Sequence, residues 1–187
     1  AAGWIEGVSK QLATLVVPQL LMPYERTRQT LDEICRGAGL PDGRQTPGMT
    51  LWEDPRLREV EHGYEDYETQ QPKRALHGWF YYRYDGGESP ADCFDRISTF
   101  LETLMRQVAR RRATQALLVT HGMAIRCFVM RFLHLSVEQF EDIANPDNCD
   151  VVTLAHASSL DEEPLFRMGR WGVVGLRLRD DAEAHQH

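Results

Sequence analysis

The chain has 187 residues, of which 42% are hydrophobic and 26% are charged, so it can form one globular domain with a substantial core. Its formal net charge of −7 argues against a nucleic-acid partner, and its longest apolar run is too short to cross a membrane. The first residues lack the basic and apolar segments of a signal peptide, and four widely spaced cysteines without a CxxC pair predict free thiols. We therefore expect a cytoplasmic protein that binds neither nucleic acid nor membrane.

The first third of the chain predicts a helix, a strand and a second helix. Apolar residues at helical spacing favour a helix over residues 4–15, and the apolar run 16–22 is typical of a strand. Pro23 suits the first turn of a helix over residues 24–36. A loop rich in glycine and proline follows, and then a short strand is expected around residues 50–52.

Residues 64–83 show no clear periodicity and contain several aromatic side chains. We interpret this stretch as an excursion that covers a site, and not as a core element. An irregular surface loop that packs on its own aromatic rings is an equal alternative. The stretch follows Glu59, a carboxylate that is a candidate site residue, and it is therefore also where we expect substrate selection to occur.

A strong helix start follows at Ser89, with Pro90 at the first helical position and Asp92 at the third. We expect this helix to run to about Arg111. Its predicted apolar face comprises Phe94, Ile97, Leu101, Leu104, Met105 and Val108.

The most informative stretch is a buried strand over residues 116–119 that runs into a helix over residues 123–135. His121 lies where the strand ends and the helix begins, which is where ligands bind in open α/β sheets. Gly122 allows the backbone to approach a ligand closely, and free N–H groups from Met123 onward suit a phosphate. A histidine that merely ends a strand is the alternative.

The last third of the chain predicts smaller elements. Ser136 caps a short helix with Gln139 at the capping-box position, and residues 145–148 form a turn. Residues 151–154 are expected to form a strand, and residues 167–179 an edge hairpin.

The alternation of strands and helices predicts an α/β fold of three α/β/α layers with a mostly parallel central sheet. We expect residues 1–179 to form a single domain and residues 180–187 a polar, disordered tail.

Several catalytic schemes are absent from the sequence, including GxSxG, GxxxxGK[ST], HExxH, GxGxxG after a strand, and any metal-ligand spacing. What remains is a guanidinium, a carboxylate and an imidazole on Arg26, Glu59 and His121. Arginine binds phosphate in a bidentate way, and a carboxyl group can transfer a proton to a leaving oxygen. This set suits phosphoryl transfer, which depends on positioning and positive charge.

At this point the sequence resembles the histidine phosphatase superfamily, the phosphoglycerate mutase-like group, from about Ala2 to Leu154. Five segments in the family's order carry the likeness. They are Met22-Pro23-Tyr24-Glu25-Arg26 with Thr30 (the family's Ser-Pro-x-x-Arg-x-x-x-Thr), Leu57-Arg58-Glu59 with Gly63 (Leu-x-Glu-x-x-x-Gly), Gly87-Glu88-Ser89 with Asp92 and Arg96, Thr120-His121-Gly122 with Arg126, and Asn148 before a strand.

The resemblance implies a role for each residue. Arg26 would bind the phosphoryl group together with the backbone at Gly122 and Met123, and His121 would hold and neutralise it. Glu59 would protonate the leaving group and later activate water. Glu61 remains an alternative to Glu59, because it lies two positions away. Neither a metal nor another cofactor is implied.

The family pattern also fails in two places. The family's nucleophile is a histidine in an Arg-His-Gly motif at the end of its first strand, and this sequence contains no Arg-His-Gly. Met22 stands where the family has serine. We expect that the given sequence lacks an N-terminal strand of the real protein, because the loss of a strand inside the sheet would cost much of a stability of only about 5–15 kcal/mol.

The resemblance therefore implies a phosphatase that hydrolyses a small-molecule phosphomonoester through a phosphohistidine intermediate. Two alternatives stay open. One is phosphoryl transfer of the phosphoglycerate mutase type, and the other is a non-catalytic member that binds a phosphate ligand or a partner. A homodimer is also left open.

Overall fold

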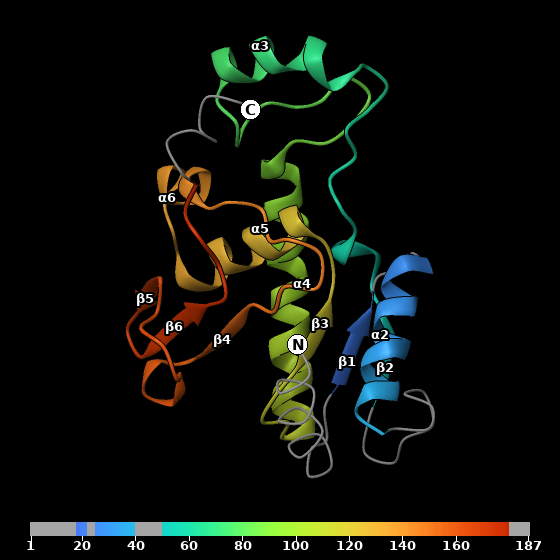
Figure 1. The fold of residues 1–187 in the computed structure, drawn as a ribbon, viewed down its shortest axis with the longest axis vertical. Coiled ribbons are helices and arrows are strands. Elements are labelled where there is room, and N and C mark those ends of the chain that lie inside the picture. The colour runs from blue at the N-terminus through green and yellow to red at the C-terminus, as the bar shows by residue number, and fades with distance from the viewer. Residues whose placement is uncertain (1–17, 22–24, 40–49, 180–187) are drawn as a thin grey trace. The chain divides into compact units, whose positions relative to one another are not determined.

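The computed structural model describes residues 18–21, 25–39 and 50–179. The chain divides into two compact units, which are described one by one (Figure 1). The first unit comprises Ala1–Arg58 and Thr99–Thr120, and the second comprises Glu59–Ser98 and His121–His187. The predicted helix over residues 4–15 and the predicted tail lie outside the described residues.

The first unit contains a parallel sheet of three short strands. These are β1 (Pro18–Leu21), β2 (Thr50–Glu53) and β3 (Leu117–Val119), in the order β2-β1-β3. Their carboxyl ends are in register, since Leu21 lies opposite both Glu53 and Val119. The three predicted strands are thus confirmed. The last of them pairs with β1 and forms one edge of the described sheet.

Helix α2 (Glu25–Gly37) packs on this sheet, as predicted. Leu31 and Cys35, four residues apart on one face of the helix, are buried against Val119 of β3. The ion pair between Arg28 and Glu53 further ties α2 to the end of β2, at 2.8 Å. The helix is therefore fixed by one apolar stripe and one charged contact.

Helix α4 (Pro90–Arg111) begins in the second unit and ends in the first. It starts as predicted, since the Oγ atom of Ser89 accepts from the Asp92 N–H at 3.1 Å while the Asp92 carboxylate accepts from the Ser89 N–H at 2.7 Å. The prediction that Met105 lies on the apolar face was wrong, because its side chain is 49% exposed. Consecutive helical residues point about 100° apart, so Met105 turns outward beside the buried Leu104. The buried residues of this helix are Cys93, Ile97, Phe100 and Leu104.

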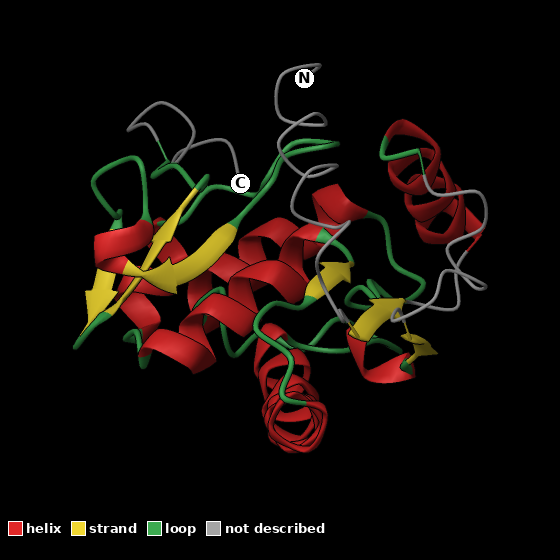
Figure 2. Ribbon diagram, turned by 90° about the horizontal axis from the view of Figure 1, so that it is seen from below, coloured by secondary structure: helices red, strands yellow, loops and turns green. Residues whose placement is uncertain are grey.

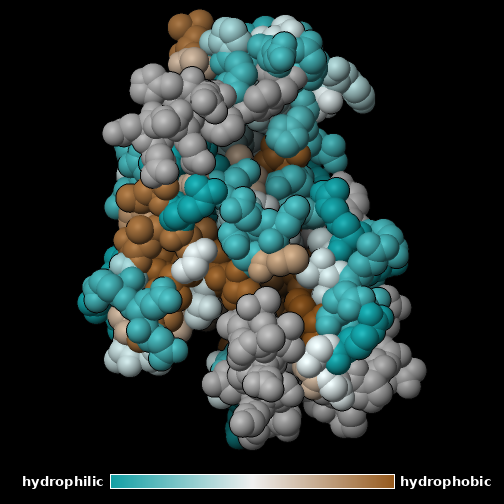
Figure 3. Space-filling view, in the orientation of Figure 1, coloured by the Kyte–Doolittle hydropathy of each residue, from teal (hydrophilic) through white to brown (hydrophobic). Residues whose placement is uncertain are grey.

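The second unit contains a helix that we did not predict, α3 (Tyr67–His77). Its start is capped by Asp66, which accepts from the Thr69 N–H at 2.8 Å. Pro72 inside the helix and a largely exposed, hydrophilic surface hide its periodicity in the sequence (Figure 3). The aromatic residues around it also contradict our interpretation of a non-core excursion, because three of them are buried: Phe80, Tyr82 and Tyr84.

The other elements of this unit are α5 (Gly122–Leu133) and α6 (Val137–Asp142), with three strands. Helix α6 has the predicted capping box, formed by Ser136 and Gln139. The strands are β4 (Thr153–His156), β5 (Phe166–Met168) and β6 (Trp171–Val174), and they form an antiparallel sheet in the order β4-β6-β5 (Figure 2).

The described strands therefore divide equally between a parallel and an antiparallel sheet. The α/β class is as predicted, but one mostly parallel central sheet is not confirmed. The predicted strand over residues 151–154 lies two residues later, and the turn before it centres on Asn148 and Cys149. In the described part of the chain, no helix has both the length and the apolar character needed to cross a membrane.

Candidate active site

The start of helix α5 is the feature on which the predicted site depends. His121 is its N-cap residue, with an extended backbone (φ −120°, ψ 164°), and its carbonyl accepts the first helical hydrogen bond from the Ile125 N–H at 2.9 Å. The His121 side chain makes no capping hydrogen bond. The first N–H groups of α5 must therefore find acceptors elsewhere.

One acceptor is the carboxylate of Glu59. Its Oε2 atom accepts from the Met123 N–H at 3.3 Å, and its Oε1 atom accepts from the Val60 N–H at 3.0 Å. A carboxylate is favoured at this end of a helix, where the dipole is positive. The half-buried Glu59 thus meets the α5 N-terminus 64 residues further along the chain, directly after His121 and Gly122.

The segment that carries Glu59 is held by the beginning of α4. The guanidinium of Arg96 donates to the Glu59 carbonyl at 3.2 Å and forms an ion pair with Glu88 at 3.2 Å. Gly87 leaves room for the Glu61 carbonyl, which would lie 2.2 Å from any Cβ at that position. The Gly-Glu-Ser motif and its arginine therefore build the support of Glu59, in addition to starting a helix.

Arg26 lies in the first turn of α2, where its side chain is exposed. It belongs to the first unit, whereas Glu59, His121, Gly122 and Met123 belong to the second. The structure thus brings four of the five predicted residues together. It places Arg26 in the first turn of a helix that follows a strand of the parallel sheet, as predicted.

Sequence reasoning missed Asn145, which lies against the same helix start. A Cβ atom built on Gly122 would meet the Asn145 side chain at 3.3–3.5 Å, and Asn145 also accepts a hydrogen bond from Arg126. The motif comparison named only Asn148, which lies in the turn before β4, and both asparagines are exposed. No local pattern distinguishes the two asparagines, because the contacts of Asn145 are with residues about 20 positions away.

Thiol chemistry is disfavoured in this region. Burial raises the pKa of the Cys127 thiol well above its usual value, and the neighbouring Cys93 thiol raises it further. A protonated thiol is a poor nucleophile. All four cysteines are free, as predicted, and three of them are buried.

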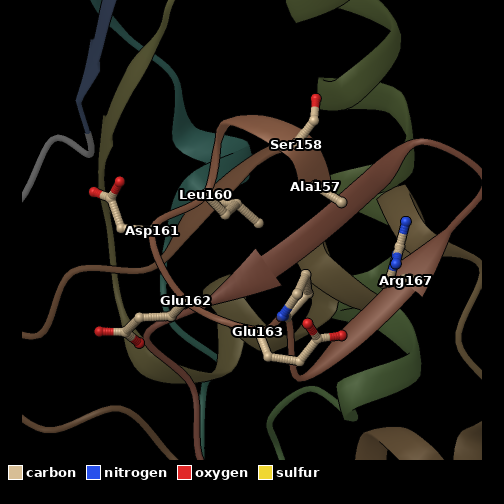
Figure 4. Close-up of a pocket in the computed structure, with 8 residues that line it drawn as sticks. Ala157, Ser158, Leu160, Asp161, Glu162, Glu163 and Arg167 are labelled. Carbon is tan, nitrogen blue, oxygen red and sulfur yellow. The ribbon is translucent and has the colours of Figure 1, made fainter.

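A depression of about 440 Å³ lies elsewhere in the second unit, around η2 (Ala157–Ser159) and the segment that leads to β5 (Figure 4). It is lined by acidic side chains, including Asp161, Glu162 and Glu163, and contains none of the predicted site residues. Within the described ranges, no group of three or more histidine, cysteine or acidic residues could hold a metal ion.

Comparison with known proteins adds independent information. The family model of the histidine phosphatase superfamily (branch 1) matches residues 11–161. Phosphoglycerate mutase-like protein AT74 of Arabidopsis thaliana is 37% identical over 142 residues, which cover 69% of this chain and 43% of the plant protein. Broad-range acid phosphatase DET1 of Saccharomyces cerevisiae is 34% identical over 131 residues, which cover 66% of this chain and 38% of the yeast protein.

This chain therefore spans less than half the length of these curated relatives. Among solved structures, a mycobacterial glucosyl-3-phosphoglycerate phosphatase superposes with a TM-score of 0.58 at 18% identity, covering 83% of this chain and 77% of the other. At that identity the likeness shows the fold, which is an α/β fold of the same kind.

Proposed function

Because the chain belongs to the histidine phosphatase superfamily, we propose that it is a phosphatase that hydrolyses a small-molecule phosphomonoester through a phosphohistidine intermediate. The observation that carries the proposal is the Glu59 carboxylate, held at 3.3 Å from the first-turn Met123 N–H beside His121. The acid phosphatase among the relatives favours hydrolysis over other phosphoryl transfers.

In the proposed mechanism, a histidine nitrogen attacks the phosphorus atom and the bond to the leaving oxygen breaks. Glu59 donates its proton to that oxygen, so that an alcohol leaves. Glu59 then takes a proton from water, which attacks the phosphorus and releases phosphate from the histidine. His121, Arg26 and the Gly122 N–H group stabilise the charge on the phosphoryl oxygens, and the Met123 N–H joins them when its hydrogen bond to Glu59 is released.

None of the seven histidines of the sequence lies in an Arg-His-Gly motif, the motif that carries the nucleophile in this family. We propose that a segment outside the given sequence supplies it. Intact-mass measurement of the protein purified from its natural source tests this idea. We expect a mass above 21.5 kDa, and a mass close to that value would contradict the proposal.

The absent motif also favours a second candidate, a non-catalytic member that binds a phosphate ligand. The two candidates differ in turnover. Rapid-quench assays of the intact protein with an aryl phosphate should show a burst of phenol and an acid-labile, base-stable phosphoprotein, with activity that persists in the presence of a chelator. Phosphate binding without any burst or turnover would favour the second candidate.

The mutase alternative is tested by the fate of the phosphoryl group. When a phosphoglycerate is the substrate, a phosphatase releases inorganic phosphate, whereas a mutase returns an isomeric phosphoglycerate. We expect phosphate release across a panel of sugar, nucleotide and aryl phosphates. Isomerisation without release would overturn the assignment as a phosphatase.

A further inference from the structure

The amide of Asn145 lies directly over Gly122 at the start of α5. The nearest approaches to a Cβ built on that glycine come from the Cγ, Oδ1 and Nδ2 atoms of Asn145, at 3.3, 3.4 and 3.5 Å. Gly122 has an ordinary helical conformation, so a glycine is needed there to leave space for a neighbouring side chain and not to allow an unusual backbone angle. We had expected that space to admit a ligand, but the Asn145 side chain occupies it.

The orientation of this amide is set by Arg126, one helical turn beyond Gly122. The Arg126 guanidinium donates to Oδ1 of Asn145 at 3.3 Å and to the Phe140 carbonyl at 2.7 Å. Arginine has no acceptor atom, so the atom of Asn145 that faces it must be the oxygen. The Nδ2 group is thereby turned away from Arg126. Because Asn145 is exposed, this group is accessible from solvent, and it donates to no residue that the structure describes.

Arg126, which orients the Asn145 amide, lies in an unusual environment for an arginine. Arg126 is only 2% exposed, and both of its hydrogen bonds go to neutral oxygens, while its guanidinium also lies over the Phe140 ring at 4.4 Å. Burial, followed by the nearby charge of Arg179, lowers the pKa of Arg126 to about 10, so it stays cationic at neutral pH. The nearby Glu141 carboxylate acts in the opposite direction and raises this pKa, so the Arg126 charge is partly balanced within the protein.

We propose that Asn145 is a further phosphate-binding residue of this site, and that Arg126 is its positioning residue. The Nδ2 group of Asn145 donates to an oxygen of the phosphoryl group bound at the α5 N-terminus, on the Gly122 side, while Glu59 lies on the Met123 side. The inference rests on the proposed function for the identity of the ligand. It adds a donor that the family motifs do not assign.

The test measures the Kd of inorganic phosphate by calorimetry on the intact protein, beside kcat/KM for an aryl phosphate. Asn145→Ala should weaken phosphate binding at least about tenfold, because a hydrogen bond to a charged group is lost. Asn145→Asp should weaken it about a hundredfold, because it brings a negative charge to a phosphate oxygen.

The aspartate variant also separates a binding role from a structural one. Its carboxylate would pair with the buried Arg126, so the melting temperature should stay the same or rise while phosphate affinity falls. A purely structural Asn145 would not produce opposite changes in the two measurements. Unchanged phosphate affinity in Asn145→Ala would overturn the inference.

Asn148→Ala is the matched control, since it removes the same side chain three positions along, from an exposed turn. We expect its phosphate affinity to equal that of the wild type, and an equal loss in both variants would count against a specific role for Asn145. Arg126→Lys should weaken binding in the wild-type background and have no further effect in Asn145→Ala. If Arg126→Lys does not fold, the phosphate affinities of the two Asn145 variants still test the proposal.

The inference and the proposed function fail in different ways. If the wild-type protein binds phosphate but shows no turnover, the phosphatase assignment is wrong, and the role of Asn145 can still be tested by phosphate affinity. If the wild-type protein hydrolyses the substrate and Asn145→Ala binds phosphate normally, only the inference about Asn145 is wrong. Absence of phosphate binding by the wild type would remove both.

Discussion

The starts of helices α4 and α5 differ in where their hydrogen-bond partners come from. The α4 start carries its own capping box, because Ser89 and Asp92 exchange hydrogen bonds within a span of four residues, and one further first-turn N–H, that of Ala91, donates to the Phe80 carbonyl at 3.0 Å. The N-cap residue of α5 is His121, whose side chain makes no capping hydrogen bond. In the first turn of α5, the Met123 N–H donates to Glu59, and Asn145 packs against Gly122; both partners come from distant parts of the sequence.

Under the proposed function, the α4 start serves stability and the α5 start serves chemistry. A self-contained capping box contributes to folding and needs no other partner. A helix N-terminus surrounded by a carboxyl, an imidazole and an amide carries groups that can act on a ligand, and its backbone dipole favours an anion. Changes at α5 should therefore affect activity, and changes at α4 should affect stability.

The largest expected effect is that of Glu59→Gln in the intact protein. An amide cannot donate a proton to the leaving oxygen as an acid does, so kcat for an alkyl phosphate should fall by about 10² to 10⁴-fold. The melting temperature should fall only slightly, since the amide oxygen can still accept from the Met123 N–H, although the amide NH2 group cannot accept from the Val60 N–H.

Glu61→Gln is the control for this change, because Glu61 is the competing carboxylate in the same segment and its side chain is exposed. We expect it to retain normal kcat. A loss of activity in Glu61→Gln together with normal turnover in Glu59→Gln would transfer the proton-donor role to Glu61.

Arg26→Ala should have the next largest effect. Loss of a charge-assisted hydrogen bond to the phosphoryl group should lower kcat/KM about 10- to 100-fold, as steady-state kinetics would measure. Arg36→Ala removes another exposed arginine from the same helix, where it pairs with Glu33, and should leave kcat/KM unchanged. Equal kinetics in the two variants would mean that Arg26 is a surface residue.

The same comparison explains what the sequence could predict. The α4 and α6 starts were predictable because the two residues of each capping box lie within four positions of each other. The Glu59 contact with Met123 was implied only by the family resemblance, since no local rule joins residues 64 positions apart. The contacts of Asn145 with Gly122 and Arg126 could not be predicted for the same reason, because they too are tertiary.

Residues 64–84 show another limit. Helix α3 has a proline in its interior and exposes most of its side chains, so neither propensity nor periodicity indicates a helix. Tyr82 and Tyr84 alternate with exposed residues and are buried, which a strand-like pattern could have suggested. Their burial depends on a core that the local sequence does not define.

The smallest expected effect concerns α4. Partial burial raises the pKa of Asp92, but hydrogen bonds from Ser89 and the charge of Arg83 outweigh it and hold the pKa below its usual value. The ionised carboxylate therefore adds stability that is complete above the unfolded-state pKa of 3.8 and is lost as the pH falls through the lower folded-state value. Asp92→Asn should lower the free energy of unfolding by about 1 kcal/mol at pH 7.

Below the folded-state pKa of Asp92 this penalty should disappear, because the wild-type carboxyl is then neutral as well. Urea denaturation of wild type and variant between pH 2 and pH 7, values chosen roughly to bracket that transition, measures the difference. Asp95→Asn on the same helix is the control, as Asp95 is exposed and should give a small difference at every pH. A pH-independent penalty in Asp92→Asn would show that the α4 start depends on shape and not on charge, and the contrast with α5 would then rest on Glu59 alone.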